Sequence, residues 1–228
     1  FNRPSNNYQG FIGSAQTSQG RASTISNIAL TGHVVGHEYV GGLVGSLYNV
    51  GAIVKNASSS VTVETTYGDA GGLVGELDNA TISNSFATGS VTDISSSNYS
   101  GALGGLVGNI FGSSAIIRNA YASGSVNGDA NSEYVGGLVG YMEYGAIYTS
   151  FASGNVIGGD GVGGLVGSAN YSVAINDNYA TGNVTGTNSV GGLIGDAYNG
   201  IDEIKRNYAT GGVTGTTFVG GFVGRAYL

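Results

Sequence analysis

The chain has 228 residues, of which 44 are Gly, one is Pro and none is Cys. The glycines lack the every-third-residue period of collagen, and the absence of cysteine excludes disulfides and thiolate metal sites. Charged residues make up 9% of the chain and the formal net charge is −7, so the sequence offers no basic surface for nucleic acid.

A lead-in segment is predicted at 1–8, where no repeat is present, and from residue 9 onward one pentapeptide recurs. Gly-Gly-Leu-Val-Gly stands at 41–45, 71–75, 104–108, 136–140 and 163–167, with GGLIG at 191–195, GGFVG at 220–224 and a degenerate QGFIG at 9–13. The copies start 27 to 33 residues apart. This period indicates units that bury their apolar side only against neighbouring units. We therefore predict one repeat array over 9–228, and we expect a fragment of a longer chain because residue 1 is not Met and 225–228 begin a further unit.

Each unit carries a second motif, I-x-x-x-(Y/F)-A-(S/T)-G-x-V, of which 82–91 is an example. Apolar and polar residues alternate within both motifs, and a helical period is absent. The pattern predicts an all-β fold, a parallel β-solenoid (β-helix) of about eight coils with two to three short strands in each coil. The coil over 46–65 lacks the aromatic residue and the glycine, so we expect an irregular turn there.

Parallel stacking in register places equivalent residues above one another. The central apolar residues of the pentapeptide then form a buried column: Leu43, Leu73, Leu106, Leu138, Leu165, Leu193 and Phe222. The flanking glycines, such as Gly41, Gly42 and Gly45, allow close backbone approach at a corner or bulge. The aromatic residues of the second motif are predicted to form a second ladder in the core: Phe86, Tyr121, Phe151, Tyr179 and Tyr208.

The pentapeptide fits the GLUG motif, in which U is a bulky apolar residue, and its spacing to the following Tyr-Ala-Thr-Gly resembles GLUG-repeat regions. The resemblance covers about 9–228. It implies a β-solenoid module at an extracellular or cell-surface location, since such regions occur in large prokaryotic surface and secreted proteins, including adhesins and the stalks of IgA-specific metallopeptidases. It implies no catalytic residue, because the motif is architectural.

Several patterns suggest metal or nucleotide sites, and none is complete. His33 and His37 are four residues apart as in zinc peptidases, but Glu38 follows the second histidine and the segment predicts strand and turn. The G-x-G-x-x-G match at 159–164 is expected by chance at this glycine content. Corner carboxylates could bind calcium but do not recur at one position of the unit: Asp69, Asp129, Asp160 and Asp196. We predict no metal and no other cofactor.

Polysaccharide cleavage is the enzymatic alternative, because it also occurs on β-solenoids and needs converging carboxylates, often with a basic residue. Glu64, Asp69 and Glu76 are the densest acidic set, and Lys55 is the basic residue nearest to them in sequence. Exposed corners explain this set without catalysis. We predict that the chain is not an enzyme.

Aromatic residues outside the motifs are candidates for binding. They follow the pentapeptide at Tyr48, Phe111, Tyr144, Tyr171, Tyr198 and Tyr227, with Asp78 in one coil. Stacked coils would align them, either as a second buried ladder or as an exposed strip for glycans or a neighbouring subunit. The stretches 93–103 and 127–135 are candidate contact loops, with tolerance of surface insertions as the alternative. Asn98 is the candidate glycosylation site.

The sequence thus favours a structural segment of an extracellular adhesin or surface fibre that associates with itself, or with neighbouring domains of its chain, through strand edges. A module that binds a glycan or a host surface is the second hypothesis. No apolar run approaches 18 residues, so no membrane insertion is predicted.

Overall fold

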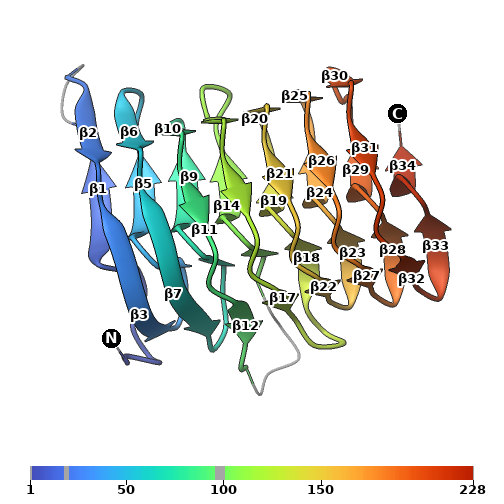
Figure 1. Cartoon of the computed structure of the whole chain (residues 1–228), viewed down its shortest axis with the longest axis horizontal. Helices are drawn as coiled ribbons and strands as arrows, with labels where there is room; N and C mark the ends of the chain where they lie inside the picture. The colour runs from blue at the N-terminus through green and yellow to red at the C-terminus, as the bar shows by residue number, and fades with distance from the viewer. Residues whose placement is uncertain (1, 18–20, 96–100, 228) are drawn as a thin grey trace.

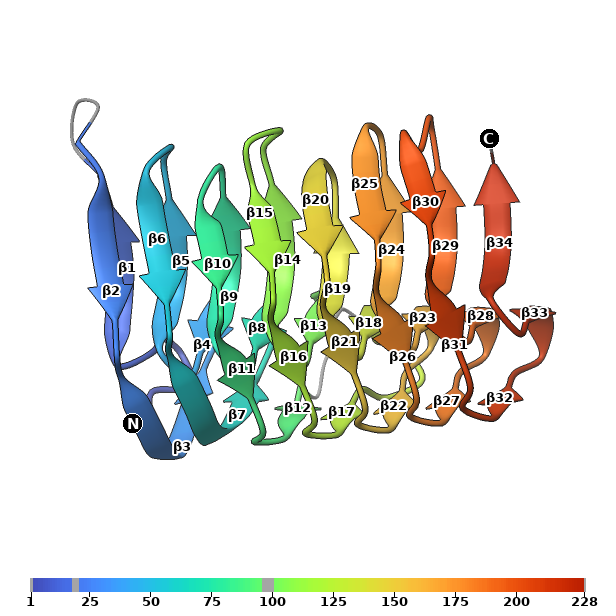
Figure 2. The same cartoon turned by 45° about the horizontal axis from the view of Figure 1, so that its top comes forward.

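The computed structural model describes residues 2–17, 21–95 and 101–227. In these ranges every regular element is a β-strand, and each strand pairs in parallel with its equivalent in the neighbouring coil (Figure 1). The coils follow one another from the N-terminal end to the C-terminal end (Figure 2). The predicted parallel β-solenoid is confirmed.

Four sheets run along the solenoid. The motif sheet follows the pentapeptides and consists of β1 (Ile12–Gln16), β5 (Val44–Tyr48), β9 (Val74–Asp78), β14 (Val107–Phe111), β19 (Val139–Met142), β24 (Val166–Asn170), β29 (Ile194–Tyr198) and β34 (Val223–Tyr227). The isoleucine sheet consists of β2 (Ser23–Ser26), β6 (Ala52–Lys55), β10 (Thr81–Ser83), β15 (Ile116–Arg118), β20 (Gly145–Tyr148), β25 (Val173–Asn176) and β30 (Glu203–Lys205).

The ladder sheet has two rows joined by the long strands β3 (Ala29–Gly36) and β7 (Ser58–Thr65). Its first row consists of β11 (Phe86–Ala87), β16 (Tyr121–Ala122), β21 (Phe151–Ala152), β26 (Tyr179–Ala180) and β31 (Tyr208–Ala209), and its second of β12 (Val91–Asp93), β17 (Val126–Asn127), β22 (Val156–Ile157), β27 (Val184–Thr185) and β32 (Val213–Thr214). The glycine sheet, which leads into the pentapeptides, consists of β4 (Val40–Gly41), β8 (Ala70–Gly71), β13 (Leu103–Gly104), β18 (Glu133–Gly136), β23 (Asp160–Gly163), β28 (Asn188–Gly191) and β33 (Thr217–Gly220).

The number of strands in a coil differs from the prediction. A coil such as β9 to β13 contains five short strands rather than two to three, because each corner interrupts the chain after two to five residues. Eight strands form the motif sheet, whereas the isoleucine and glycine sheets hold seven each, so the described chain makes about seven turns.

The irregular turn expected within 46–65 is wrong, since β7 is one of the two longest strands. Phe86 pairs with Ser58 and Val91 with Val63, so both coils use the same number of residues at this corner. In the later coil the corner holds Gly89, where a Cβ would lie 2.0 Å from the carbonyl oxygen of Val61. β7 continues across the position at which later coils bend, and so does β3, which has Gly32 at this register position.

Two hydrophobic cores run along the solenoid. The larger core contains the fully buried leucine column: Leu43, Leu73, Leu106, Leu138, Leu165 and Leu193. Phe222, the last member, is 38% exposed. The smaller core lies between the glycine sheet and the second row of the ladder sheet. The cores are divided at the second pentapeptide glycine, since a Cβ at Gly72 would lie 2.3 Å from the Gly105 carbonyl oxygen and 2.9 Å from the Cβ of Ala87.

The aromatic ladder stacks but does not lie in the core, which corrects the prediction. Its successive ring centroids are 4.7 to 5.0 Å apart and its planes deviate by 3 to 5° across Phe86, Tyr121, Phe151, Tyr179 and Tyr208. Four of the rings are half-buried, and Tyr208 is 53% exposed. Side chains alternate along a strand, and the alanine that follows each ring takes the inward position against the pentapeptide glycines, where a larger residue has no room.

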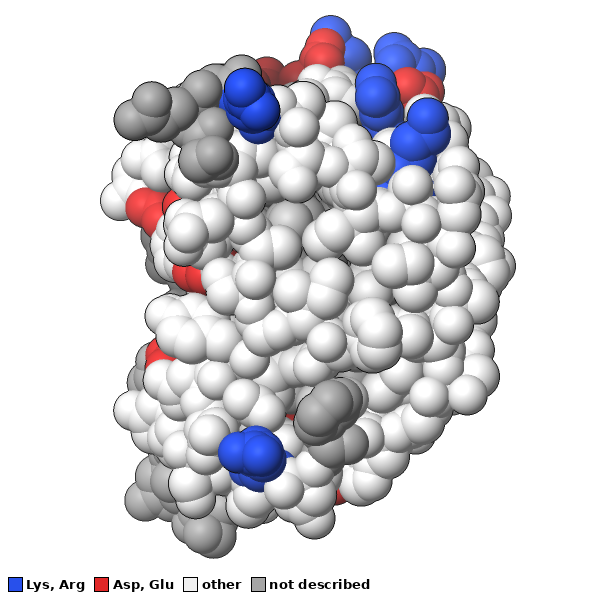
Figure 3. Space-filling model, turned by 90° about the vertical axis from the view of Figure 1, so that its left-hand side faces the viewer, with Lys and Arg blue, Asp and Glu red and all other residues white. Residues whose placement is uncertain are grey.

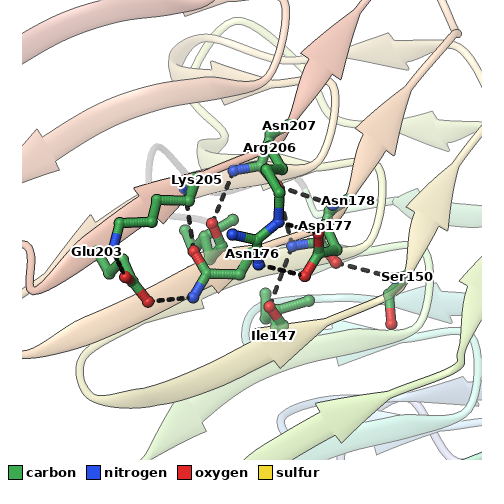
Figure 4. Close-up of polar contacts among 10 residues, drawn as sticks. Ile147, Ser150, Asn176, Asp177, Asn178, Glu203, Lys205, Arg206 and Asn207 are labelled. Carbon is green, nitrogen blue, oxygen red and sulfur yellow. Dashed lines mark hydrogen bonds and ion pairs between the residues drawn. The ribbon is translucent and has the colours of Figure 1, made fainter.

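The corner between the isoleucine and ladder sheets carries stacked polar side chains near the C-terminal end (Figure 4). Asn178 is 1% exposed, accepts a hydrogen bond from the Ser150 amide at 2.9 Å and donates one to the Ile147 carbonyl at 3.0 Å. Asn207 repeats the pattern one coil later, with the Ile175 carbonyl at 2.7 Å. These side chains satisfy the backbone at the corner and therefore have a structural role.

Candidate functional site

A groove runs along the outer face where the glycine sheet meets the motif sheet. Viewed end-on, the molecule is hollowed on this side between two lobes, and acidic atoms line the hollow (Figure 3). The floor is formed by the third pentapeptide glycine, because a Cβ at Gly75 would lie 2.5 Å from the carbonyl carbon of Tyr39. One wall consists of the residues that directly follow the pentapeptides, which are Ser46, Glu76, Asn109, Tyr141, Ser168, Asp196 and Arg225 in register.

The groove opens into a cleft of about 360 Å³ between Tyr39 and Tyr134. The pairing of β4, β8, β13 and β18 places Asp69 and Ala102 at the positions of these tyrosines in the two intervening coils. The side chains of Asp69 and Ala102 are smaller than a tyrosine ring, so they leave open the space that the rings of Tyr39 and Tyr134 fill in the coils on either side. The cleft is lined by Glu38, Tyr39, Tyr67, Gly68, Asp69, Gly101, Ala102, Asn109, Glu133, Tyr134 and Tyr141.

Asp69 is the most constrained carboxylate of the cleft. Its Oδ1 accepts a hydrogen bond from the Ala102 amide at 2.7 Å, and its Oδ2 accepts one from Asn109 Nδ2 at 2.7 Å. Burial raises the pKa of Asp69 above its ordinary value, and these two hydrogen bonds oppose that shift. The two donors therefore stabilise the charged form of Asp69, but burial still makes this charge unfavourable.

Neighbouring groups show that the cleft is electronegative. Burial raises the pKa of Glu76, which the hydrogen bond from Ser46 Oγ at 2.6 Å opposes. Burial and the nearby carboxylates of Glu38, Glu76 and Asp69 raise the pKa of the Tyr39 hydroxyl. Within the described ranges, the lining contains no Lys or Arg side chain.

Asn109 adds an acceptor without a donor. Its side chain is buried, with 8% of the residue exposed, and its Nδ2 is committed to Asp69. Its Oδ1 has no hydrogen-bond partner among the described residues. A buried amide oxygen without a partner is uncommon in a folded protein.

The far end of the groove holds an ion pair. Asp196 is 1% exposed and accepts hydrogen bonds from Arg225 Nε at 2.8 Å and Nη2 at 3.1 Å. The guanidinium carbon lies 5.2 Å from the ring centroid of Tyr198, 5.4 Å from that of Phe218 and 5.6 Å from that of Tyr227. Here the groove already binds a cation between a carboxylate and aromatic rings.

The predicted acidic set is divided between two places. Asp69 and Glu76 both lie along the groove, and the charge of Asp69 contributes to raising the pKa of Glu76. Glu64 lies on β7, where its carboxylate is 3.1 Å from His33 Nε2. The three acids therefore do not converge on one site.

The histidine and calcium candidates also separate. His37 Nδ1 is 3.2 Å from the Thr66 hydroxyl and its ring stacks on Tyr67, away from His33. Each of the remaining corner carboxylates has a separate partner, and the three pairs lie at different places along the solenoid: Asp129 contacts Ser132, Asp160 contacts Asn188 and Asp196 contacts Arg225. The described residues include no group of three or more His, Cys, Asp or Glu side chains placed to hold a metal ion.

The aromatic residues after the pentapeptide do not form one column. Tyr144 stacks on Tyr171 at 5.4 Å, and Tyr198 stacks on Tyr227 at 5.2 Å. The partner of Tyr198 in register is Asn170, because Tyr171 comes one residue later in its coil. Tyr48 pairs with Asp78, which pairs with Phe111. The predicted aligned strip is thus broken, and the candidate glycosylation residue Asn98 lies outside the described residues.

Four lining residues were not among the site residues expected from the sequence: Tyr39, Asn109, Tyr134 and Tyr141. One signal was available, since Glu-Tyr-Val-Gly-Gly occurs at 38–42 and again at 133–137. These two copies form the two ends of the cleft. The predicted contact loops 93–103 and 127–135 contribute Gly101, Ala102, Glu133 and Tyr134 to its lining.

Comparison with known families identifies the repeat. The family described as "The GLUG motif" matches four segments, residues 36–64, 66–92, 99–127 and 131–157. The chain contains GLUG repeats. The coils after residue 157 continue the same four sheets in register. No curated protein and no solved structure matches the chain. Among the described residues, no helix is long and apolar enough to cross a membrane.

Proposed function

We propose that this GLUG-repeat chain is a non-enzymatic structural segment of an extracellular adhesin or surface fibre, which associates through its strand edges. The observation that supports this function is the stacking of coils in parallel register: among the described residues β1 pairs only with β5 and β34 only with β29, so each outermost coil can pair with a further coil, of this chain or of a second copy. Unpaired edge strands are templates for a further strand. The partner is a second copy or a neighbouring domain of the same chain.

The last coil also exposes apolar side chains. Phe218 is 51% exposed, Val219 46%, Phe222 38% and Tyr227 55%. The side chains at the column positions of Val219 and Phe222 are buried in the coils before it, because each coil is covered by the next. The last described coil therefore presents an apolar surface that a further coil, of this chain or of a second copy, would cover.

Light scattering over a dilution series tests the association. We expect the chain to form end-to-end assemblies whose mass rises with concentration, and we expect Val219→Lys at the last coil to shift this rise to at least about tenfold higher concentration. Ile157→Lys is the matched control, because Ile157 is also 46% exposed but lies in an inner coil. A strictly monomeric rod at all concentrations would refute the association.

Glycan or host-surface binding is the second candidate, and the stacked pair of Tyr144 and Tyr171 favours it. Tyr171 is 40% exposed, so one ring of the pair offers apolar area beside its hydroxyl. The continuous aromatic ladder is less suited to sugars, because its rings cover one another's faces. A glycan array tests this candidate: any signal should be lost on Tyr171→Ala, and binding that survives this change would exclude the pair.

A further inference from the structure

The two ends of the groove present the same chemistry with one difference. At the far end, Asp196 and three aromatic rings surround the guanidinium of Arg225. The cleft is lined by Asp69 and by four tyrosines, and within the described chain no Lys or Arg side chain lines it. At its far end the groove therefore already binds a cation, the guanidinium of Arg225. The cleft contains the same kinds of groups, a carboxylate and aromatic rings.

Hydrogen bonding points to the same kind of ligand. Glu38, Asp69 and Glu133 present carboxylates, which accept hydrogen bonds, and Asn109 Oδ1 is a buried acceptor without a partner among the described residues. A ligand that satisfies this set must donate several hydrogen bonds and carry positive charge. Guanidinium and ammonium groups do both, and they also bind favourably over tyrosine rings.

Size and geometry distinguish an organic cation from a metal ion. The cleft spans three coil spacings between Tyr39 and Tyr134, about 14 Å at the usual strand separation, and its volume is about 360 Å³. Within the described ranges its carboxylates do not converge as metal ligands. The space fits a side chain or small molecule with a charged head.

We propose that the cleft binds an organic cation of the alkylguanidinium or alkylammonium class, such as an arginine or lysine side chain of a partner. The charged head lies against the carboxylate of Asp69 and donates to Asn109 Oδ1. The rings of Tyr39 and Tyr134 enclose its two sides, and Glu133 adds a second carboxylate at the rim.

Calorimetric titration of the whole chain tests this site with three probes. Nα-acetylarginine amide and Nα-acetyllysine amide carry the proposed head groups, and Nα-acetylcitrulline amide has nearly the shape of the first without the charge. We expect the charged probes to bind and the citrulline probe to bind at least about tenfold more weakly. Raising the salt from about 0.01 to about 1 M should weaken binding, because the Debye length falls from about 30 to about 3 Å.

Asp69→Asn should weaken binding of the arginine probe at least about tenfold. This variant should fold, since the new amide can accept the Ala102 hydrogen bond and Asn109 can rotate to present its oxygen. Asp129→Asn is the matched control, because Asp129 is an exposed carboxylate outside the cleft, and it should bind as the parent does. The site would be overturned by equal binding of the citrulline probe, by unchanged binding to Asp69→Asn, or by no binding of either charged probe up to about 10 mM.

Discussion

The cleft and the far end of the groove are built by the same backbone and differ in charge. Asp196 is paired with Arg225 in the next coil, and the pKa of Arg225 is raised because of this partner. The pKa of Asp69 is raised because burial opposes its charge and its partners are neutral donors. The repeated backbone therefore builds the same groove along the coils. One side chain in each coil decides whether the groove there is filled by a residue of the chain itself or left open for a ligand.

The largest expected effect follows from removing the internal cation. Arg225→Ala leaves the Asp196 carboxylate buried without its charged partner, and breaking a pair of this kind costs about 3 kcal/mol. Because the pair is in the last coil, the loss should be local. Urea unfolding and amide hydrogen exchange in β29 and β34 measure it, and millimolar methylguanidine should restore protection by occupying the emptied position.

An exposed ion pair provides the control. Arg206 Nη2 lies 2.7 Å from Asp177 Oδ2 with both side chains largely in solvent, 65% and 42% exposed. Arg206→Ala should cost much less stability than Arg225→Ala, because solvent screens exposed ion pairs. If both arginine variants lost equal stability, burial of Asp196 would not explain the difference between the two ends.

The next test introduces an arginine into the cleft, at the position that Arg225 occupies at the far end of the groove. Asn109 occupies the column position that Arg225 occupies in the last coil, next to the buried carboxylate of Asp69. Asn109→Arg should place a guanidinium in the cleft, and it should weaken binding of Nα-acetylarginine amide at least about tenfold. Full retention of binding by a folded Asn109→Arg protein would show that the probe binds elsewhere.

The smallest effect concerns stability and pH. A carboxyl whose pKa is higher in the folded state than in the unfolded state binds more protons when folded, so ionisation destabilises the fold. The raised pKa of Asp69 therefore predicts that its contribution to stability falls as pH rises from the ordinary aspartate value through the raised one. Asp69→Asn should stabilise the protein near neutral pH, on the order of 1 kcal/mol.

Thermal unfolding of both proteins across this pH range measures the effect. The difference between Asp69→Asn and the parent should be largest near neutral pH and should vanish in acid. A variant that is less stable than the parent at neutral pH would mean that the hydrogen bonds to Asp69 outweigh the cost of burying its charge.

Much of the fold was predictable because the repeat constrains it. The alternation of apolar residues in 82–91 and the recurrence of the pentapeptide predict parallel strands stacked in register. The predicted position of the aromatic ladder in the core was wrong. Alternation along a strand predicts that the side chains of Phe86 and Ala87 point in opposite directions, but it does not predict which one faces inward. The narrow space beside Gly72 decides this, and only the packing of neighbouring coils reveals it.

The candidate site was predictable only in part. Asp69 and Glu76 were singled out as acidic residues, and the duplicated Glu-Tyr at 38–39 and 133–134 was available as a signal. The enclosing role of these tyrosines depends on the small residues at the same position in the two coils between them, which becomes visible only when the register is known.

By itself the sequence determined the period, the parallel stacking and the buried leucine column, because a short coil can bury its apolar residues only against its neighbours. The tertiary structure decided which polar side chains share the groove. Asp69, which directly precedes β8 of the glycine sheet, and Asn109, on β14 of the motif sheet, are 40 residues apart. Their hydrogen bond exists because the strand register and the bend between these two sheets bring them to one face. Charge and hydrogen bonding act over a few ångströms, so the chemistry of the cleft follows from this bend rather than from the repeat.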